Sequence, residues 1–402
     1  MTENIKYTET SIGLIPSDWK VEKLGSLGKV ISGLTYSPDD VKEEGVLVLR
    51  SSNIQDRKLK FLDNVYVNVS IGNFNPVKKG DILICVRNGS KSLIGKNALI
   101  TEQIDGVAFG AFMAIFRSEF SEYLFQIFGT DLFQKEIHKN LGATINSING
   151  SDLKLFKIPV PPIPEQEKIA ALLSTWDVAI DNCKNIIEKI SYRNKGLEQQ
   201  FLSGKIRVKG FEKTQWHLKS VEEVAVFKNG KAHENCIDEE GDYFVVNSKF
   251  ISTQGKVAKA SNENLCPLFK NDITMVMSDI PNGKAFAKCF YIPEDDKYTL
   301  NQRICALTAR KGTDSKFLFY QMNRNNYYLA FNNGVSQTNL KKEEVLECPL
   351  LMPDIEEQIQ IVKLIDTATE ELNQYQQKLE ALQLQKRGLM QQLLTGKTRV
   401  KI

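Results

Sequence analysis

Two long stretches of this chain carry apolar residues at alternating steps of four and three positions. The first row starts at Ile169 and the second at Ile361, and each has one polar interruption, Asn194 in the first and Lys386 in the second. This spacing is the a/d seam of a heptad helix, which buries its apolar stripe against a partner helix. We predict two long helices that pack on each other through the seam residues Ile169, Leu173, Trp176, Ile180, Ile187, Ile190, Leu197 and Phe201 in the first and Ile361, Ile365, Leu372, Leu379, Leu382, Leu389 and Leu393 in the second.

A tandem duplication relates the two helices. The segment from Leu202 to Lys209, LSGKIRVK, returns as LTGKTRVK from Leu394 to Lys401, 192 residues later. The same offset relates Glu165-Gln166 to Glu357-Gln358. A helix from about Glu165 to Ser203 is about 57 Å long at about 1.5 Å per residue, which is longer than a compact domain needs and indicates a spacer.

The segments before the two helices are also related. Trp19 and Gly33 recur as Trp216 and Gly230 at an offset of 197, so the repeats differ by a few residues that loops can absorb. Short β-like runs at 46–49, 81–86 and 112–116 indicate strands, and amphipathic helices are predicted over about 120–139 and 315–331. The predicted fold class is α+β: two similar α+β domains separated by two long antiparallel coiled-coil helices, an internal tandem repeat with pseudo-two-fold symmetry. The predicted boundaries are 1–157 and 211–350 for the domains, 158–210 for the first helix with its linker, and 351–402 for the second helix.

Composition is that of a globular protein: 402 residues, 42% hydrophobic, 25% charged, with a formal net charge of +3. No uninterrupted apolar run is long enough to cross a membrane, and the N-terminal residues lack the order of a signal peptide, so we expect a cytoplasmic protein with no membrane partner. The seven cysteines are scattered without a C-x-x-C pair, and zinc-ligand spacing is absent. We therefore predict no metal site and no thiol chemistry.

Catalytic motifs are absent from the sequence. The stretch from Gly89 to Lys96 has one residue too many for a phosphate-binding loop and ends in Asn97 where Ser or Thr is needed. Gly396-Lys397-Thr398 has Gln391 where the leading glycine should stand, so it is better explained as a helix cap. No Asn/Asp-Pro-Pro-aromatic methyltransferase motif is present. These observations predict a binding protein with no catalytic residues and no cofactor of its own.

At this point the chain resembles the specificity (S) subunit of type I restriction-modification systems. The resemblance covers nearly the whole chain, and the order and duplication of its motifs carry it. The motifs are IPSDW at 15–19, GDILI at 80–84, PPIPEQEKI at 161–169, GVSQTNL at 334–340 and LLTGK at 393–397. It implies two target-recognition domains that each bind one half of a gapped DNA sequence, with the paired helices as a ruler.

The resemblance also implies partners. Two modification (M) subunits, which carry the adenine methyltransferase and S-adenosylmethionine, would bind this chain, and restriction (R) subunits would join them for ATP- and Mg-dependent translocation and cleavage. Double-stranded DNA would be the ligand. A specificity chain of a type IIB system is an alternative within DNA recognition. The alternatives from other classes are a coiled-coil scaffold that binds proteins and an enzyme with an unrecognised site, which the missing motifs disfavour.

Candidate DNA contacts lie in polar loops that correspond between the repeats but differ in sequence. Arg, Lys, Asn, Gln and Ser donate to and accept from base edges and phosphates. Asn-Gly sequences also form ordinary turns, so for any single loop a structural role is at least as probable. Because the net charge is small, the DNA surface must be local. The predicted contacts are Arg50, Ser51, Asn53, Arg87, Asn88, Ser90, Lys91 and Lys96 in the first domain, and Asn247, Ser248, Lys249, Ser278, Asn282, Lys284, Asn301, Arg303 and Gln337 in the second.

Overall fold

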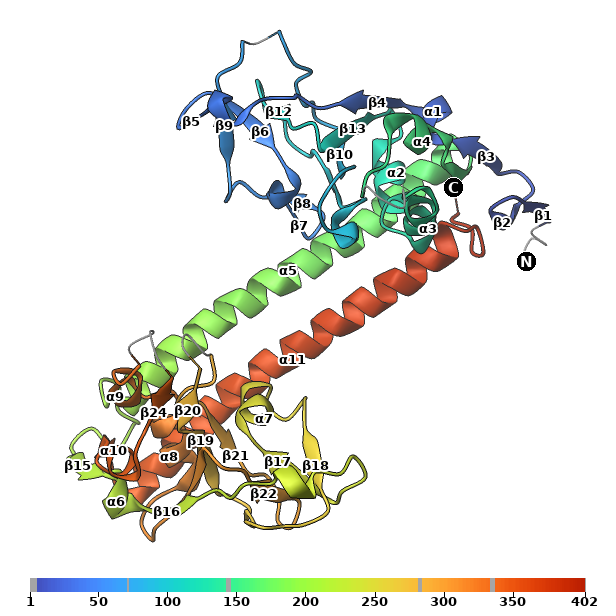
Figure 1. The fold of residues 1–402 in the computed structure, drawn as a ribbon. Helices are drawn as coiled ribbons and strands as arrows, with labels where there is room; N and C mark the ends of the chain where they lie inside the picture. Colours follow the sequence, from blue (N-terminus) through green and yellow to red (C-terminus); the bar gives the residue numbers. More distant parts are fainter. Residues whose placement is uncertain (1–5, 71, 142–145, 281–283, 333–336, 402) are drawn as a thin grey trace. The chain divides into compact units, whose positions relative to one another are not determined.

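The computed structural model describes residues 6–70, 72–141, 146–280, 284–332 and 337–401. The chain divides into two compact units (Figure 1). Unit 1 comprises Met1–Lys184 with Gln377–Ile402, and unit 2 comprises Asn185–Gln376. Each unit therefore contains one α+β domain and parts of both long helices, whereas the predicted boundaries place the helices in segments of their own.

The main sheet of unit 1 has four antiparallel strands in the order β11-β10-β13-β4. All side chains of the central strand β10 are buried, which explains its unbroken apolar sequence. A second sheet, in the order β12-β6-β9-β5, contains a parallel pairing of β12 with β6. The strands of the two sheets are β4 (Lys29–Ser32), β10 (Ile82–Cys85), β11 (Asn97–Leu99) and β13 (Met113–Arg117), and β5 (Val41–Lys42), β6 (Val46–Leu49), β9 (Val65–Val67) and β12 (Ala108–Phe109).

Unit 2 repeats this topology. Its main sheet has the order β16-β23-β19-β21, and its second sheet, β18-β17-β22, again contains a parallel pair, β17 with β22. The shared order confirms that the two α+β domains are similar. The strands are β16 (Ala225–Asn229), β19 (Ile273–Val276), β21 (Cys289–Tyr291) and β23 (Ile304–Ala309), and β17 (Tyr243–Val246), β18 (Lys259–Ser261) and β22 (Tyr298–Leu300).

Short two-stranded pairs complete each unit. In both units one of these pairs joins the strand directly after the repeated tryptophan to the strand that leads into a long helix. These pairs are β3 with β14 and β15 with β25. The pairs in unit 1 are β1 (Tyr7–Thr10) with β2 (Gly13–Pro16), β3 (Lys20–Lys23) with β14 (Lys157–Val160), and β7 (Ile54–Gln55) with β8 (Lys58–Leu59). Those in unit 2 are β15 (His217–Ser220) with β25 (Pro349–Met352) and β20 (Ser278–Asp279) with β24 (Thr338–Asn339).

Each amphipathic segment predicted as one helix forms two. In unit 1, α2 ends and α3 starts anew because the Thr130 hydroxyl accepts a hydrogen bond from Phe133 N and caps α3. In unit 2, the side chain of Asn325 caps α9 in the same manner. The shorter helices are α1 (Leu24–Leu27), α2 (Ser121–Ile127), α3 (Asp131–Asn140), α4 (Gly150–Leu155), α6 (Val221–Val224), α7 (Ser248–Ser252), α8 (Ser315–Met322), α9 (Asn326–Leu329) and α10 (Lys342–Leu346).

The two predicted long helices are present as α5 (Ile163–Leu202) and α11 (Ile355–Leu393). A repeated glycine follows the end of each helix within three residues, and Gly204 and Gly396 have φ of +67° and +70°, the left-handed conformation that closes a helix. Every predicted seam side chain is buried or half-buried. The first turns of α5 and the last turns of α11 share the core of unit 1, and the last turns of α5 and the first turns of α11 pack in the core of unit 2. Within each unit the two helices are therefore antiparallel.

The two polar seam positions make specific contacts between the helices. Lys386 Nζ lies 2.5 Å from Asp177 Oδ1 in unit 1, and Asn194 Nδ2 donates to the carbonyl of Ala368 at 2.6 Å in unit 2. Burial lowers the pKa of Lys386, and the ion pair with Asp177 opposes that shift. A polar seam group that finds its partner in one alignment only selects that helix register.

The duplicated tail ties each unit together. In unit 1, Arg399 Nε donates to Glu165 Oε1 at 2.6 Å, and Trp19 Nε1 donates to Glu165 Oε2 at 3.0 Å. The Glu165 side chain is fully buried. In unit 2, Arg207 and Trp216 bind Glu357 through the same atoms at 2.9 and 3.0 Å. Each tail thus closes on the helix start of the other repeat.

Six of the seven cysteines are buried in the units. Burial raises the pKa of the Cys305 thiol to about 12, so this thiol stays protonated at neutral pH. Among the described residues, no helix is long and apolar enough to span a membrane.

Candidate nucleic-acid interface

The predicted contacts of unit 1 gather where β6 and β10 end. Arg50 and Ser51 follow β6, and Asn88 Nδ2 donates to Ser51 Oγ at 3.1 Å. Lys96 Nζ donates to the Ser51 carbonyl at 3.2 Å. The structure thus places residues from three separate loops in one cluster, and Arg50, Ser51, Asn88 and Lys96 are all partly accessible.

Arg87 extends this cluster from the end of β10. Its exposed guanidinium lies 5.7 Å from the ring centroid of Phe112, which is itself 56% exposed. Asn146 Nδ2 donates to the carbonyl of Gly89 and holds the loop that carries exposed Ser90 and Lys91. Phe112 and Asn146 are absent from the predicted contacts. The sequence analysis placed Phe112 at the start of an apolar run predicted as a strand, and an apolar residue type gives no sign of exposure.

A hollow of about 630 Å³ lies beside this cluster. Tyr36, Ser52 and Phe112 line it together with Arg50, whose guanidinium pairs with Asp63 at 2.8 Å. Arg50 Nε is enclosed and has no acceptor among the described residues. A guanidinium held in place by a carboxylate presents its other donors in a fixed plane, which suits the acceptors on a purine edge.

Asn53 does not belong to this surface. Its side chain is fully buried, its Oδ1 accepts from Arg50 N at 2.9 Å, and its Nδ2 donates to the Lys60 carbonyl at 3.1 Å. The expectation that Asn53 contacts DNA is therefore wrong. Its amide shapes the turn that positions Arg50, a role that Asn residues commonly have in loops.

The predicted contacts of unit 2 form two groups. In the first, Gln337 Nε2 donates to Ser278 Oγ at 2.8 Å, across the pairing of β20 with β24. Gln337 is exposed, whereas Ser278 is buried, so Ser278 holds Gln337 rather than reaching outward. Lys284, a few residues after Ser278 in the chain, is exposed. Asn282 lies outside the described residues.

The second group lies at the ends of β17 and β22. Asn301 follows β22, and Arg303 is exposed with a φ of +66°. Asn247 follows β17 and caps α7, since its Oδ1 accepts from Phe250 N at 2.9 Å, and this structural role uses its acceptor. Ser248 and Lys249 form the first turn of α7, with Lys249 exposed.

The two units differ at equivalent positions. Tyr36 lines the hollow of unit 1, three residues after Gly33, and the residue three after Gly230 is His233. His233 is buried, with Nδ1 2.7 Å from the Lys231 carbonyl and Nε2 2.8 Å from Thr299 Oγ1. Phe112 in unit 1 similarly corresponds to Arg303 in unit 2. A common scaffold therefore presents different hydrogen-bonding groups in each unit. The described residues contain no group of three or more His, Cys, Asp or Glu side chains arranged to hold a metal ion.

The sequence matches the family model described as the type I restriction modification DNA specificity domain twice, over residues 16–192 and 213–383. The chain belongs to this family. The two matches coincide with the two repeats, and together they cover most of the chain, so both units carry a specificity domain.

Named relatives agree with the family. The chain is 27% identical over 427 aligned positions to a putative type I restriction enzyme MjaX specificity subunit of Methanocaldococcus jannaschii, covering 99% of this chain and 97% of the relative. It is 30% identical over 212 positions to the type I restriction enzyme EcoKI specificity subunit of Escherichia coli (strain K12), a match that spans 50% of this chain and 46% of the relative.

Solved structures agree on the fold. The S subunit of a type I restriction-modification system from M. genitalium superposes with a TM-score of 0.58 at 17% identity, covering 98% of this chain and 97% of that chain. A chain from a study of complex assembly and conformational transition of the type I R-M system gives a TM-score of 0.59 at 13% identity, covering 96% and 99%.

Proposed function

We propose that this specificity-family chain reads a gapped, bipartite target in double-stranded DNA, with one half-site for each unit. The observation that carries the proposal is the pair of domains with one topology and different side chains at equivalent loop positions: Arg50, Arg87 and Phe112 in unit 1 stand where unit 2 has Asn247, Ser278 and Arg303. Different donors and acceptors on the same scaffold select different bases. The two half-sites are therefore expected to be unlike in sequence.

The chain itself contributes recognition and no chemistry. Its family consists of non-catalytic recognition subunits of restriction-modification complexes. We propose that two modification subunits bind this chain. The long helix and its tail occur twice in the duplicated sequence, so a subunit that binds one copy can also bind the other. The adenine methyltransferase with S-adenosylmethionine, and the ATP- and Mg-dependent restriction activity, would reside on the partner subunits.

The proposal is tested by co-expressing the chain with the modification subunit from its own genome and mapping methylated adenines in the host DNA. A two-part motif separated by unspecified bases is expected. Absence of any motif from cells that contain the assembled, soluble complex would contradict the proposal. Complete failure of the two subunits to assemble would favour a protein-binding scaffold instead.

Exchanging residues 1–155 for the same segment of a relative should change one half of the methylated motif and leave the other half intact, because only unit 1 receives new loops. The donor must keep Trp19 and Asp18, which bind Glu165 and Arg399. The measurement is again the methylation map. A matched exchange of 211–347 should change only the other half, and an exchange that alters both halves would refute independent reading.

Replacing Arg87 by Ala should weaken specific duplex binding by about 1–3 kcal/mol, or about 5- to 150-fold, if its guanidinium contacts a base. Titrations with the cognate duplex at several salt concentrations measure this effect. Lys79→Ala is the control, because Lys79 is also exposed but precedes β10, whereas Arg87 follows it. Equal affinity of Arg87→Ala and the control would remove Arg87 from the interface.

A further inference from the structure

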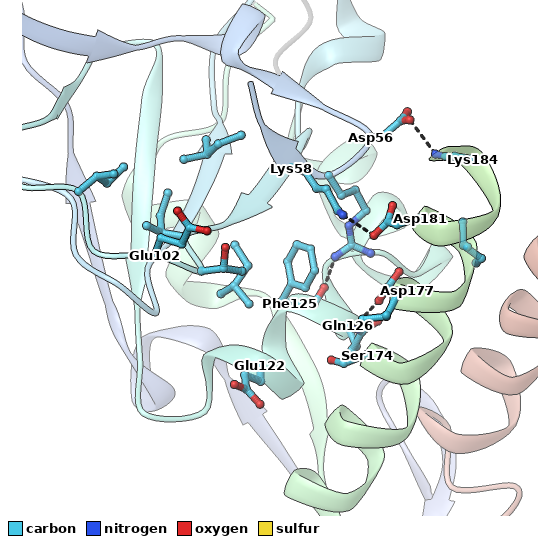
Figure 2. A pocket seen from close by; sticks show the side chains of 18 of the residues that line it. Asp56, Lys58, Glu102, Glu122, Phe125, Gln126, Ser174, Asp177, Asp181 and Lys184 are labelled. Atoms are coloured by element: carbon cyan, nitrogen blue, oxygen red, sulfur yellow. Dashed lines mark hydrogen bonds and ion pairs between the residues drawn. The ribbon is translucent and has the colours of Figure 1, made fainter. Parts of the chain in front are cut away.

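A cleft of about 440 Å³ lies in unit 1 between the first α+β domain and α5 (Figure 2). The hairpin β7–β8 closes one side of it and is fixed to α5 by two ion pairs. Lys184 Nζ lies 2.7 Å from Asp56 Oδ2, and Lys58 Nζ pairs with Asp181. These two ion pairs fix the position of the hairpin against α5.

The floor of the cleft is apolar and partly accessible. Leu59, Ile104 and Phe125 line it and are half-buried. Phe61 and Val178 lie at its edges and are 46% and 59% exposed. Large apolar side chains that stay accessible beside a concave surface are typical of binding sites, because their burial stabilises a complex.

Three side chains of the cleft have acceptor oxygens without a partner among the described residues. Gln126 is 1% exposed, and its Nε2 donates to Asp177 Oδ2 at 3.1 Å, so its Oε1 is the unpaired atom. Glu102 and Glu122 are exposed, lie on the side away from the hairpin in Figure 2, and make no ion pair within the described part of the chain. A ligand that satisfies these groups must bring donors and positive charge.

Lys58 and Lys184 are ion-paired, and the third cation of the cleft, Arg57, points toward the interior of the domain. The Arg57 guanidinium packs 3.9 Å from the Phe125 ring centroid and donates to Asn97 Oδ1 at 3.2 Å. Its Nε is enclosed without a partner among the described residues, and burial lowers its pKa to about 10, so Arg57 stays charged at neutral pH. Arg57 therefore supports the floor, and Glu102 and Glu122 are the exposed charges of the cleft that have no ion-pair partner among the described residues.

We propose that this cleft docks a segment of a protein partner in which a Lys or Arg side chain stands beside an apolar side chain. The apolar side chain would cover Phe125 and Val178, and the cation would meet Glu122 and Glu102. DNA is excluded as the occupant because its phosphates would face unpaired carboxylates. The cleft is thus a protein-docking surface distinct from the interface proposed to read DNA, and it does not depend on that proposal.

Unit 2 has a cation of its own, Lys316, at the position that corresponds to Glu122 in the cleft of unit 1. Helices α2 and α8 correspond in sequence, and Lys316 stands on α8 where Glu122 stands on α2. Lys316 Nζ lies 2.6 Å from Asp366 Oδ2, so unit 2 supplies its own cation at the corresponding contact with a long helix. The residue of α11 equivalent to Val178 is Glu370, which removes the apolar edge. One partner segment per chain is therefore expected.

Photo-crosslinking tests this docking surface in the full chain assembled with the modification and restriction subunits of its own genome. Val178 is replaced by p-benzoylphenylalanine, the complex is irradiated, and crosslinked peptides are identified by mass spectrometry. We expect one partner segment with Lys or Arg close to an apolar residue, at no more than one per chain. Glu122→Lys, which copies unit 2, should lower the crosslink yield by about tenfold, and Glu122→Gln should lower it less.

The control places the photoreactive residue at Glu370 in unit 2, where the same segment should not be captured. The proposal is overturned if Val178 captures only residues of its own chain, an acidic segment or DNA, or if Glu370 captures the same segment equally well. Adenine methylation is measured on the same preparations. Normal methylation without the crosslink would reject the docking surface and leave the specificity role intact. A crosslink without methylation would support the docking surface and contradict the specificity role.

Discussion

Arg399→Ala is expected to lower the free energy of unfolding of unit 1 by about 3–5 kcal/mol, because it leaves a buried carboxylate without its cation. Glu165 is fully buried and, among the described residues, would retain only the hydrogen bond from Trp19 Nε1. Arg207→Ala should have the same effect on unit 2 through Glu357. Hydrogen exchange measured for individual segments during urea denaturation reports the change in each unit separately. A single global unfolding transition would not distinguish the two units.

Arg193→Ala is the matched control for these two variants. It breaks the ion pair of Arg193 with Glu371, whose side chains are 45% and 43% exposed. An exposed pair contributes at most about 1 kcal/mol. If Arg399→Ala and Arg207→Ala cost no more than Arg193→Ala, the tails do not stabilise the units in the way argued from the buried carboxylates.

The effect of Arg207→Ala should also depend on pH. Burial by itself raises the pKa of Glu357, but hydrogen bonds from Arg207, Trp216 and Thr214 bring it below its ordinary value of 4.5. A carboxyl whose pKa is lower in the folded state stabilises that state above its unfolded pKa, and this contribution is lost as pH falls through the folded pKa. The difference between the wild type and Arg207→Ala should therefore be full at neutral pH and shrink below about pH 4. A constant difference down to pH 3 would show that Glu357 is not the source.

Gly33→Ala and Gly230→Ala are each expected to destabilise their unit by about 2–3 kcal/mol, because there is no space for a side chain. A Cβ on Gly33 would lie 2.1 Å from the Gly110 carbonyl oxygen, and one on Gly230 would lie 1.9 Å from that of Asn301. Both obstacles are backbone atoms, so a side-chain rotation cannot relieve the clash. Each glycine also packs against the loop that carries Phe112 or Arg303, so duplex binding should weaken as well. Urea denaturation and duplex titration measure the two effects.

The repeated glycines Gly196 and Gly388 provide the control for these substitutions. Both lie inside a long helix, and a Cβ at either position meets no atom within 4 Å. Alanine there should stabilise the helix by about 0.5–1 kcal/mol, since glycine is the weaker helix former. A comparable loss of stability in all four variants would contradict the close-approach explanation for Gly33 and Gly230.

Local patterns in the sequence predicted the elements whose causes are local. The heptad rows that contain Leu173 and Leu379 determined both long helices, and the repeated Gly204 and Gly396 marked their ends to within a few residues. The duplication predicted two domains of one topology, because equal sequences fold alike, and the family resemblance followed from the same repeated motifs. The single helix predicted near residues 120–139 was wrong because the capping hydroxyl of Thr130 starts a second helix.

Only the tertiary structure decided which polar residues meet. The partner of Arg399 is Glu165, 234 positions away along the chain, and no local pattern encodes such a pairing. The same holds for Asn53, which the fold buries, and for Phe112, which the fold exposes beside Arg87. The sequence by itself determined the periodic elements, their duplication and the family, because these depend on neighbours within a few turns. The fold alone determined the buried carboxylates, the surface near Arg87 and the cleft at Glu122, because each combines side chains from segments that are distant in the chain.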